Sequence, residues 1–135
     1  MRPGPPRGET VTADIVVTPD AAEHAGPDGQ GPLIYTTSAL ATDAERLCRS
    51  LVEPHLEPGE YAVAAAIELR HRAPIPVGET VRLHATVATV VRTKLVCELL
   101  IRHGSAIVAR GSFEHRIVDA NMLDAEVAAH RSATG

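Results

Sequence analysis

Aromatic residues and cysteines are scarce in this chain of 135 residues, which has no tryptophan, two tyrosines, one phenylalanine and two cysteines. Two cysteines are too few for a disulfide framework or a cysteine-rich zinc site. The histidines show no metal-ligand spacing, so we expect no bound metal. Because 44% of the residues are nevertheless hydrophobic, the core must consist mainly of aliphatic side chains.

Long apolar runs and basic segments are also missing. The longest uninterrupted apolar run, residues 62–67, is far shorter than the roughly 20 residues of a membrane-spanning helix. Residues 1–6 lack the hydrophobic stretch of a secretory signal. The formal net charge is −4, and no basic block is present to bind nucleic acid. We therefore expect one soluble, cytoplasmic domain that binds neither membranes nor nucleic acids. Its excess of arginine over lysine is typical of a GC-rich bacterial coding sequence.

Hydrophobic periodicity predicts one strand, then a helix, then four consecutive strands. The helix is predicted over 36–53, because apolar residues recur there at helical spacing: Leu40, Ala44, Leu47, Cys48 and Leu51. Alternating and β-branched residues predict strands at 9–18, 61–72, 79–92, 94–102 and 106–118. The remaining segments are predicted as a disordered tail (1–8), a loop or lid (19–32), and a short helix and tail (119–135).

This order of elements predicts an α+β hotdog fold over residues 9–118. In that architecture a long antiparallel sheet wraps around one central helix, and each buries an apolar face against the other. A single domain of this kind leaves a sheet edge uncovered, so we expect a homodimer.

A few polar residues interrupt the predicted apolar faces. His71 and His115 share the parity of the apolar residues in their strands, and Glu45 lies at the edge of the helix's apolar arc. The alternatives to a functional role are buried structural histidines and a surface ion pair of Glu45 with Arg49. Thr37, near the predicted helix start, is either a functional residue or an N-cap.

These residues and their spacing resemble the fluoroacetyl-CoA thioesterase family of single-hotdog enzymes over about residues 8–118. The resemblance rests on Thr37, on Glu45 eight positions later, on the turn 56–60 (Leu-Glu-Pro-Gly-Glu), and on 71–74 (His-Arg-Ala-Pro) with Gly78. It implies that Thr37, Glu45 and His71 form a catalytic set that hydrolyses an acyl-CoA or acyl-carrier-protein thioester. It also implies that no cofactor is used beyond the coenzyme A of the substrate.

The resemblance further implies substrate-binding positions. A backbone amide on the strand of His71 corresponds to Ala64, and Tyr35 lies near the expected acyl end. An arginine near the end of the family's last strand corresponds to His115, or to Arg116 if the register slips by one. The family's aromatic lid residues align with 27–31, Pro-Asp-Gly-Gln-Gly, so we expect no strong preference for fluoroacetyl-CoA over acetyl-CoA.

Two other functions remain open on the sequence. A non-catalytic acyl-thioester binding protein would keep an apolar pocket without needing the three polar residues together. A hotdog hydratase or dehydratase usually has an Asp/His pair at the helix entry, whereas residues 35–50 contain no histidine. For a thioesterase, the sequence leaves open whether Glu45 attacks the carbonyl or activates water.

Overall fold

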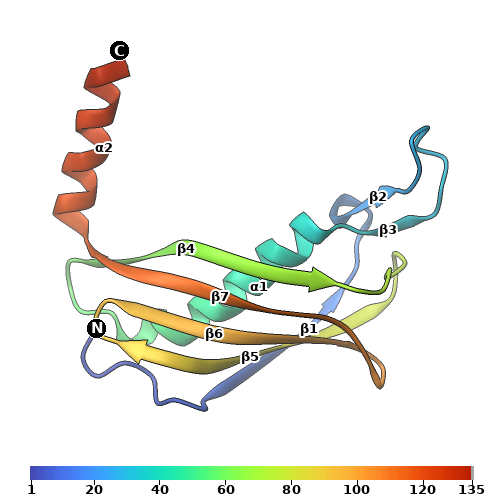
Figure 1. The fold of residues 1–135 in the computed structure, drawn as a ribbon, viewed down its shortest axis with the longest axis horizontal. Helices are drawn as coiled ribbons and strands as arrows, with labels where there is room; N and C mark the ends of the chain where they lie inside the picture. The colour runs from blue at the N-terminus through green and yellow to red at the C-terminus, as the bar shows by residue number, and fades with distance from the viewer. Residues whose placement is uncertain (135) are drawn as a thin grey trace.

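The structure, a computed structural model, describes the backbone of residues 1–134 and the side chains of residues 1–131. Within these residues an antiparallel five-stranded sheet has the order β1-β5-β6-β7-β4, and the long helix α1 lies across one face of it (Figure 1). The bounds are Thr10–Val16 for β1, Thr37–Val52 for α1, Glu60–His71 for β4, Thr80–Val91 for β5, Lys94–His103 for β6 and Ala106–Asp119 for β7. The predicted hotdog architecture is confirmed.

Helix α1 forms where the apolar spacing predicts it. The hydroxyl of Thr36 accepts a hydrogen bond from the backbone N–H of Ala39 at 3.0 Å and so caps the first turn. The predicted apolar stripe is buried against the sheet, and Val52 extends it. Because Thr36 is the cap, Thr37 begins the helix and its own side chain is free for another contact.

The alternation along β4 changes phase at a β-bulge between Ala64 and Ala66. A bulge inserts one extra residue, which exchanges the two faces of the strand beyond it. Ala64 lies opposite the buried His115, and past the bulge Ile67 lies opposite the buried Phe113. The uninterrupted parity predicted from sequence, with Val63 and Ala65 on the face of His71, is therefore wrong before the bulge. His71 itself lies on the expected inner face.

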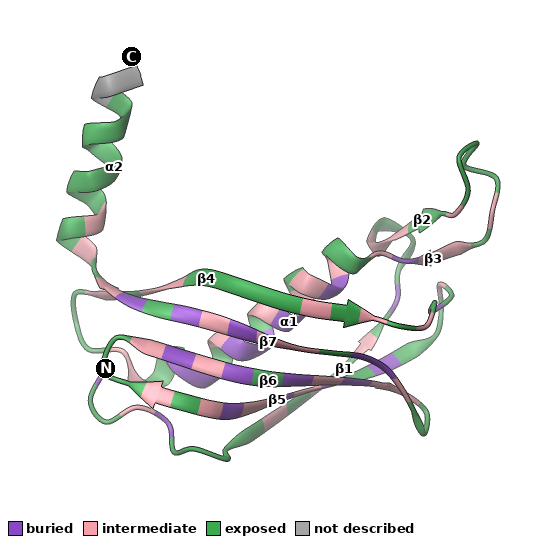
Figure 2. Cartoon of the chain, viewed as in Figure 1, coloured by how far each residue is buried: buried purple, intermediate pink, exposed green. Residues whose placement is uncertain are grey.

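Strand β4 also forms one edge of the sheet, and most of its residues are exposed (Figure 2). Residues 64–68 of this edge carry small or apolar side chains apart from Glu68. Ile67 is 43% exposed, although Phe113, which lies opposite it on β7, is buried. The outer side of β4 pairs with no other strand among the described residues.

Residues 19–32, predicted as a loop or lid, contain more structure than composition indicates. A 3₁₀ turn at Pro19–Ala21 leads into β2 (Ala22–His24), which pairs with β3 (Leu33–Tyr35). The resulting hairpin extends from the N-terminal end of α1 (Figure 1). Strands of three residues are too short to show a hydrophobic period, so the sequence carries little signal for them.

The two ends of the chain differ in how they pack. Met1 is buried, and its ammonium group pairs with the carboxylate of Glu60 at 2.6 Å, although composition predicts disorder for 1–8. At the other end, helix α2 (Ala120–Thr134) continues from β7 and projects away from the sheet (Figure 1). Among the described residues, no helix combines the length and apolarity needed to cross a membrane.

Candidate active site

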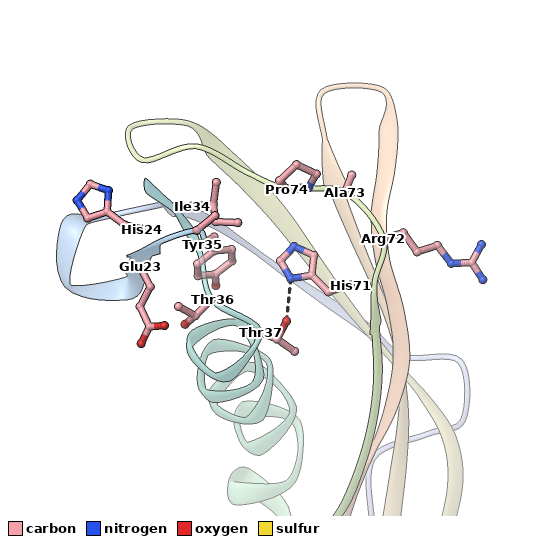
Figure 3. Close-up of a pocket in the computed structure, with 11 residues that line it drawn as sticks. Glu23, His24, Ile34, Tyr35, Thr36, Thr37, His71, Arg72, Ala73 and Pro74 are labelled. Atoms are coloured by element: carbon pink, nitrogen blue, oxygen red, sulfur yellow. Dashed lines mark hydrogen bonds between the residues drawn. The ribbon is translucent and has the colours of Figure 1, made fainter. Parts of the chain in front are cut away.

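The first turn of α1 and the end of β4 bring Thr37 and His71 into contact (Figure 3). Oγ1 of Thr37 lies 3.1 Å from Nδ1 of His71, within hydrogen-bond distance. The ring of Tyr35 lies edge-on to the imidazole, with 6.4 Å between the ring centres. Three residues selected from the sequence therefore meet at one point, where the helix begins.

The electrostatics of this point favour a neutral imidazole. Burial lowers the pKa of His71, and a hydrogen bond with the backbone of Ala73 offsets only part of this effect. Nε2 of His71 is buried and has no hydrogen-bond partner among the described residues. Burial and the neighbouring Asp43, to which the Tyr35 hydroxyl donates, raise the pKa of Tyr35, so the phenol stays protonated. His71 can thus accept or deliver a proton near neutral pH.

A cavity of about 400 Å³ opens beside Thr37 and His71. Its walls come from the β2–β3 hairpin, from the start of α1 and from residues 71–74 (Figure 3). Ile34, Ala73 and Pro74 supply apolar surface, while Glu23 and His24 lie at its outer end. A cleft with apolar walls and a few convergent polar groups is the usual form of a small-molecule site.

Glu45 does not touch Thr37 or His71 within the chain. It lies two turns further along α1, about 12 Å at the rise of an α-helix. Its carboxylate pairs with Arg49, which is the surface pair that the sequence offers as an alternative. A second cavity, of about 430 Å³, lies against Glu45, Ile67 and Phe113. Within the chain, Arg49 holds the Glu45 carboxylate one turn toward the C-terminal end of α1, away from Thr37.

The other positions selected from the sequence fall into two groups. Ala64 and His115 lie opposite each other on the inner faces of β4 and β7, and Nε2 of His115 lies 3.9 Å from Oε1 of Glu45. Arg116 lies on the other face of β7, is 60% exposed and donates to Glu114 at 3.2 Å. Of the two register alternatives for the family's arginine, His115 is therefore the one that faces Glu45.

Two features of the site escape sequence reasoning. Asp43 holds the Tyr35 hydroxyl, but its sequence position among polar helix residues does not distinguish it from a solvated side chain. His115 and Glu45 come together only through the packing of β7 against α1, which no local pattern encodes. In the described part of the chain, no three His, Cys, Asp or Glu side chains are grouped so as to hold a metal ion.

The sheet wrapped on one helix, with a Thr–His pair at the helix entry and a carboxylate further along, defines a hotdog-fold protein of the thioesterase type. The family model for the fluoroacetyl-CoA-specific thioesterase matches residues 7–121, and the chain belongs to this family.

Individual relatives agree with this assignment. The chain is 28% identical over 132 residues to the fluoroacetyl-CoA thioesterase of Streptantibioticus cattleyicolor, covering 94% of this chain and 95% of that protein. A solved structure of a fluoroacetyl-CoA thioesterase matches with a TM-score of 0.82 at 27% identity, over 93% of this chain and 96% of that one. A thioesterase superfamily member from Thermus thermophilus matches with a TM-score of 0.88 at 23% identity, over 98% and 97% of the two chains, and supports the fold alone.

Proposed function

We propose that this chain hydrolyses acyl-CoA thioesters, with Thr37, Glu45 and His71 as its catalytic set. The observation that carries the proposal is the contact between Thr37 and His71 on the wall of a cavity, in a chain of the fluoroacetyl-CoA-specific thioesterase family. In the reaction an oxygen from water bonds to the carbonyl carbon and the carbon–sulfur bond breaks. The products are a carboxylic acid and the coenzyme A thiol.

Each proposed catalytic residue has a task suited to its surroundings. Glu45 attacks the carbonyl carbon or takes a proton from the attacking water, and both routes need its carboxylate within reach of the thioester. His71, neutral at rest because burial lowers its pKa, first accepts a proton and then, as the imidazolium, delivers it to the leaving thiolate. Thr37 orients the ring of His71 through their 3.1 Å contact. The proposed reaction uses water and these side chains, without a metal or a cofactor besides the substrate's coenzyme A.

The thioester is proposed to lie along the boundary between α1 and β4. Both cavities open on this boundary: one beside Thr37 and His71, the other beside Glu45 and Ile67. Tyr35, beside Thr37, and Ala64, on the inner face of β4, are proposed to contact the substrate. His115 is fully buried and faces Glu45, so it is not proposed as a direct substrate contact. The Arg116 side chain lies on the outer face of β7, away from α1. A substrate contact with Arg116 would therefore involve only a part of the ligand that extends past the edge of the sheet.

The acyl group is proposed to differ from fluoroacetyl. The tip of the β2–β3 hairpin carries no aromatic side chain, and Gly31 leaves no room for one, because a Cβ there would lie 2.3 Å from the carbonyl oxygen of Ala25. The same close approach lets the N–H of Gly31 donate to that oxygen at 2.7 Å. With Glu23 and His24 at the outer end of the cavity, a larger or more polar acyl group fits this hairpin better.

We also propose a cytoplasmic homodimer that pairs along the β4 edges. An exposed, unpaired strand edge with small side chains is a surface that proteins normally cover. Pairing there would enclose Ile67 and the cavity beside Glu45, so the site would lie at the subunit interface. Cys48 and Cys97 are buried free thiols, as is usual in a reducing compartment.

Release of free thiol from a panel of acyl-CoA and acyl-carrier-protein thioesters tests the proposed function. Turnover of at least one thioester, giving acid and thiol in equal amounts, is the expected result. Tight binding of acyl-CoA without thiol release would instead identify a non-catalytic binding protein. Addition or loss of water at an acyl double bond, with the thioester intact, would identify a hydratase or dehydratase.

A further inference from the structure

His115 is a fully buried polar side chain whose ring has no hydrogen bond within the described chain. Its exposed fraction is 0%, and neither Nδ1 nor Nε2 has a partner among the described residues. The ring stacks on Phe113, with 4.9 Å between centres and 26° between planes. Leaving a buried polar group unpaired costs about 1–3 kcal/mol, so a core position of this kind favours an apolar residue unless the histidine has a task.

The imidazole faces the proposed catalytic carboxylate. Nε2 of His115 lies 3.9 Å from Oε1 of Glu45, and the other oxygen, Oε2, is buried without a hydrogen-bond partner in the described structure. Glu45 is only 16% exposed, so solvent satisfies little of its carboxylate. Moving one group by about 1 Å, within the range of a small side-chain rotation, would close the gap to a normal hydrogen bond.

The charged neighbours of His115 come from α1. Glu45 and Arg49 face the ring from that helix, while the residues opposite it on the adjacent strands are Leu95 on β6 and Ala64 on β4. Burial, assisted by the positive charge of Arg49, lowers the pKa of His115 from 6.5 to about 4. At neutral pH the ring is therefore uncharged, with one nitrogen as a donor and the other as an acceptor.

Arg49 and His115 bind Glu45 with different consequences for its chemistry. Arg49 is 43% exposed and positively charged, and an ion pair with it both draws the carboxylate outward and weakens it as a base. A neutral imidazole donor fixes the carboxylate while withdrawing less of its negative charge. The stacking on Phe113 holds that donor in one direction.

Building on the proposed thioester hydrolysis, we propose that His115 is a positioning residue whose Nε2–H donates to Oε1 of Glu45. This bond draws the carboxylate away from Arg49 and directs Oε2 toward the thioester. The role differs from direct substrate contact, because His115 acts through Glu45 and stays behind it in the core.

Two substitutions of His115 separate positioning from packing. His115→Phe fills the core and can stack on Phe113 but has no donor, whereas His115→Gln restores an N–H donor. We expect His115→Phe to lower kcat about 10²-fold with KM changed by less than about threefold, because the carboxylate is misplaced while binding is kept. We expect His115→Gln to recover about tenfold of that loss. Glu114→Gln, at the adjacent position on the opposite face, is the control and should behave as wild type.

The outcomes distinguish this inference from the proposed function itself. Wild-type kcat in folded His115→Phe, alongside an inactive Glu45→Gln, would leave the thioesterase intact and overturn the positioning role. A rise in KM without a fall in kcat, or no recovery in His115→Gln, would overturn it as well.

A readout independent of turnover applies if no thioester is hydrolysed or if His115→Phe does not fold. NMR of the ring nitrogens of His115 should change on Glu45→Gln and stay constant on Glu68→Gln, whose side chain is exposed. Unchanged His115 signals in Glu45→Gln would contradict the inference without bearing on the activity.

Discussion

The hydroxyl of Thr37 lies 3.1 Å from Nδ1 of His71, so the first turn of α1 is joined to the last residue of β4. The contact is possible because Thr36, one residue earlier, takes the capping role. Thr37 is thereby available to hold the histidine rather than the helix end. The pair lies where the positive end of the helix dipole favours the negative charge that develops on a thioester oxygen.

The first prediction concerns the coupling of Thr37 and His71. We expect His71→Ala to lower kcat/KM about 10²–10⁴-fold, since a proton-transfer group is lost, and Thr37→Ala to cost less. Because Thr37 acts through His71, the double variant should be no worse than His71→Ala alone. Kinetics of the four proteins on one thioester check this, with Ser38→Ala as a neighbouring control. Losses that simply multiply would show that the two residues act independently.

The second prediction concerns the acyl group. Because the tip of the hairpin lacks an aromatic side chain, fluoroacetyl-CoA and acetyl-CoA should have similar kcat/KM values. A preference for fluoroacetyl above about 10³-fold, or roughly 4 kcal/mol of transition-state stabilisation, would contradict this account of the hairpin. We also expect Gly31→Phe to perturb the hairpin instead of creating a preference, because a Cβ at that position meets the backbone of Ala25.

The third prediction is that stability falls in mild acid. Above pH 6.5 His115 is neutral in both the folded and the unfolded protein. As the pH falls from 6.5 toward 4, His115 binds a proton in the unfolded chain but stays neutral in the folded protein. The contribution of His115 to the free energy of unfolding is therefore fully present above pH 6.5. It decreases by on the order of 3 kcal/mol as the pH falls through this window. The lowered pKa of His71 acts in the same direction. Urea unfolding at several pH values measures the slope, and His115→Phe should reduce it; an unchanged slope would count against a neutral buried ring.

The fourth prediction is a dimer that depends on the β4 edge. Light scattering at micromolar concentration should give twice the chain mass of 14.3 kDa. Ala65 has no cross-strand partner on β7, so Ala65→Pro should disturb the outer edge with little damage to the sheet and should shift the mass toward a monomer. Circular dichroism checks that the variant is folded. A wild-type monomer at these concentrations would rule out the proposed interface.

The sequence predicts those parts of the fold that follow a simple period. The helix stripe from Leu40 to Leu51 and the alternation of β6 are confirmed, because each element buries one face against a single partner. The phase of β4 is not predicted, because the run Ala64-Ala65-Ala66 gives no sign of where the bulge falls. The packing of Met1 is missed for a similar reason: an ion pair with Glu60 joins residues remote in sequence.

In the candidate site too, features that follow a local sequence pattern are predicted, and features that depend on tertiary packing are not. The parity of His71 and its place near Thr37 agree with the structure, since both lie at the ends of regular elements. The catalytic roles of Thr37, Glu45 and His71 stay predictions. The placement of Glu45 between Arg49 and His115 depends on which residues of β7 face α1, and therefore on tertiary packing.

The measurement that tests the central claim most directly is the turnover of Glu45→Ala on a thioester that the wild type hydrolyses. We expect the folded variant to lose nearly all activity, about 10³-fold or more, because neither His71 nor Thr37 can replace the carboxylate. Folding is checked by comparing the thermal unfolding of the two proteins. Wild-type turnover by folded Glu45→Ala would show that Glu45 serves only as the ion-pair partner of Arg49.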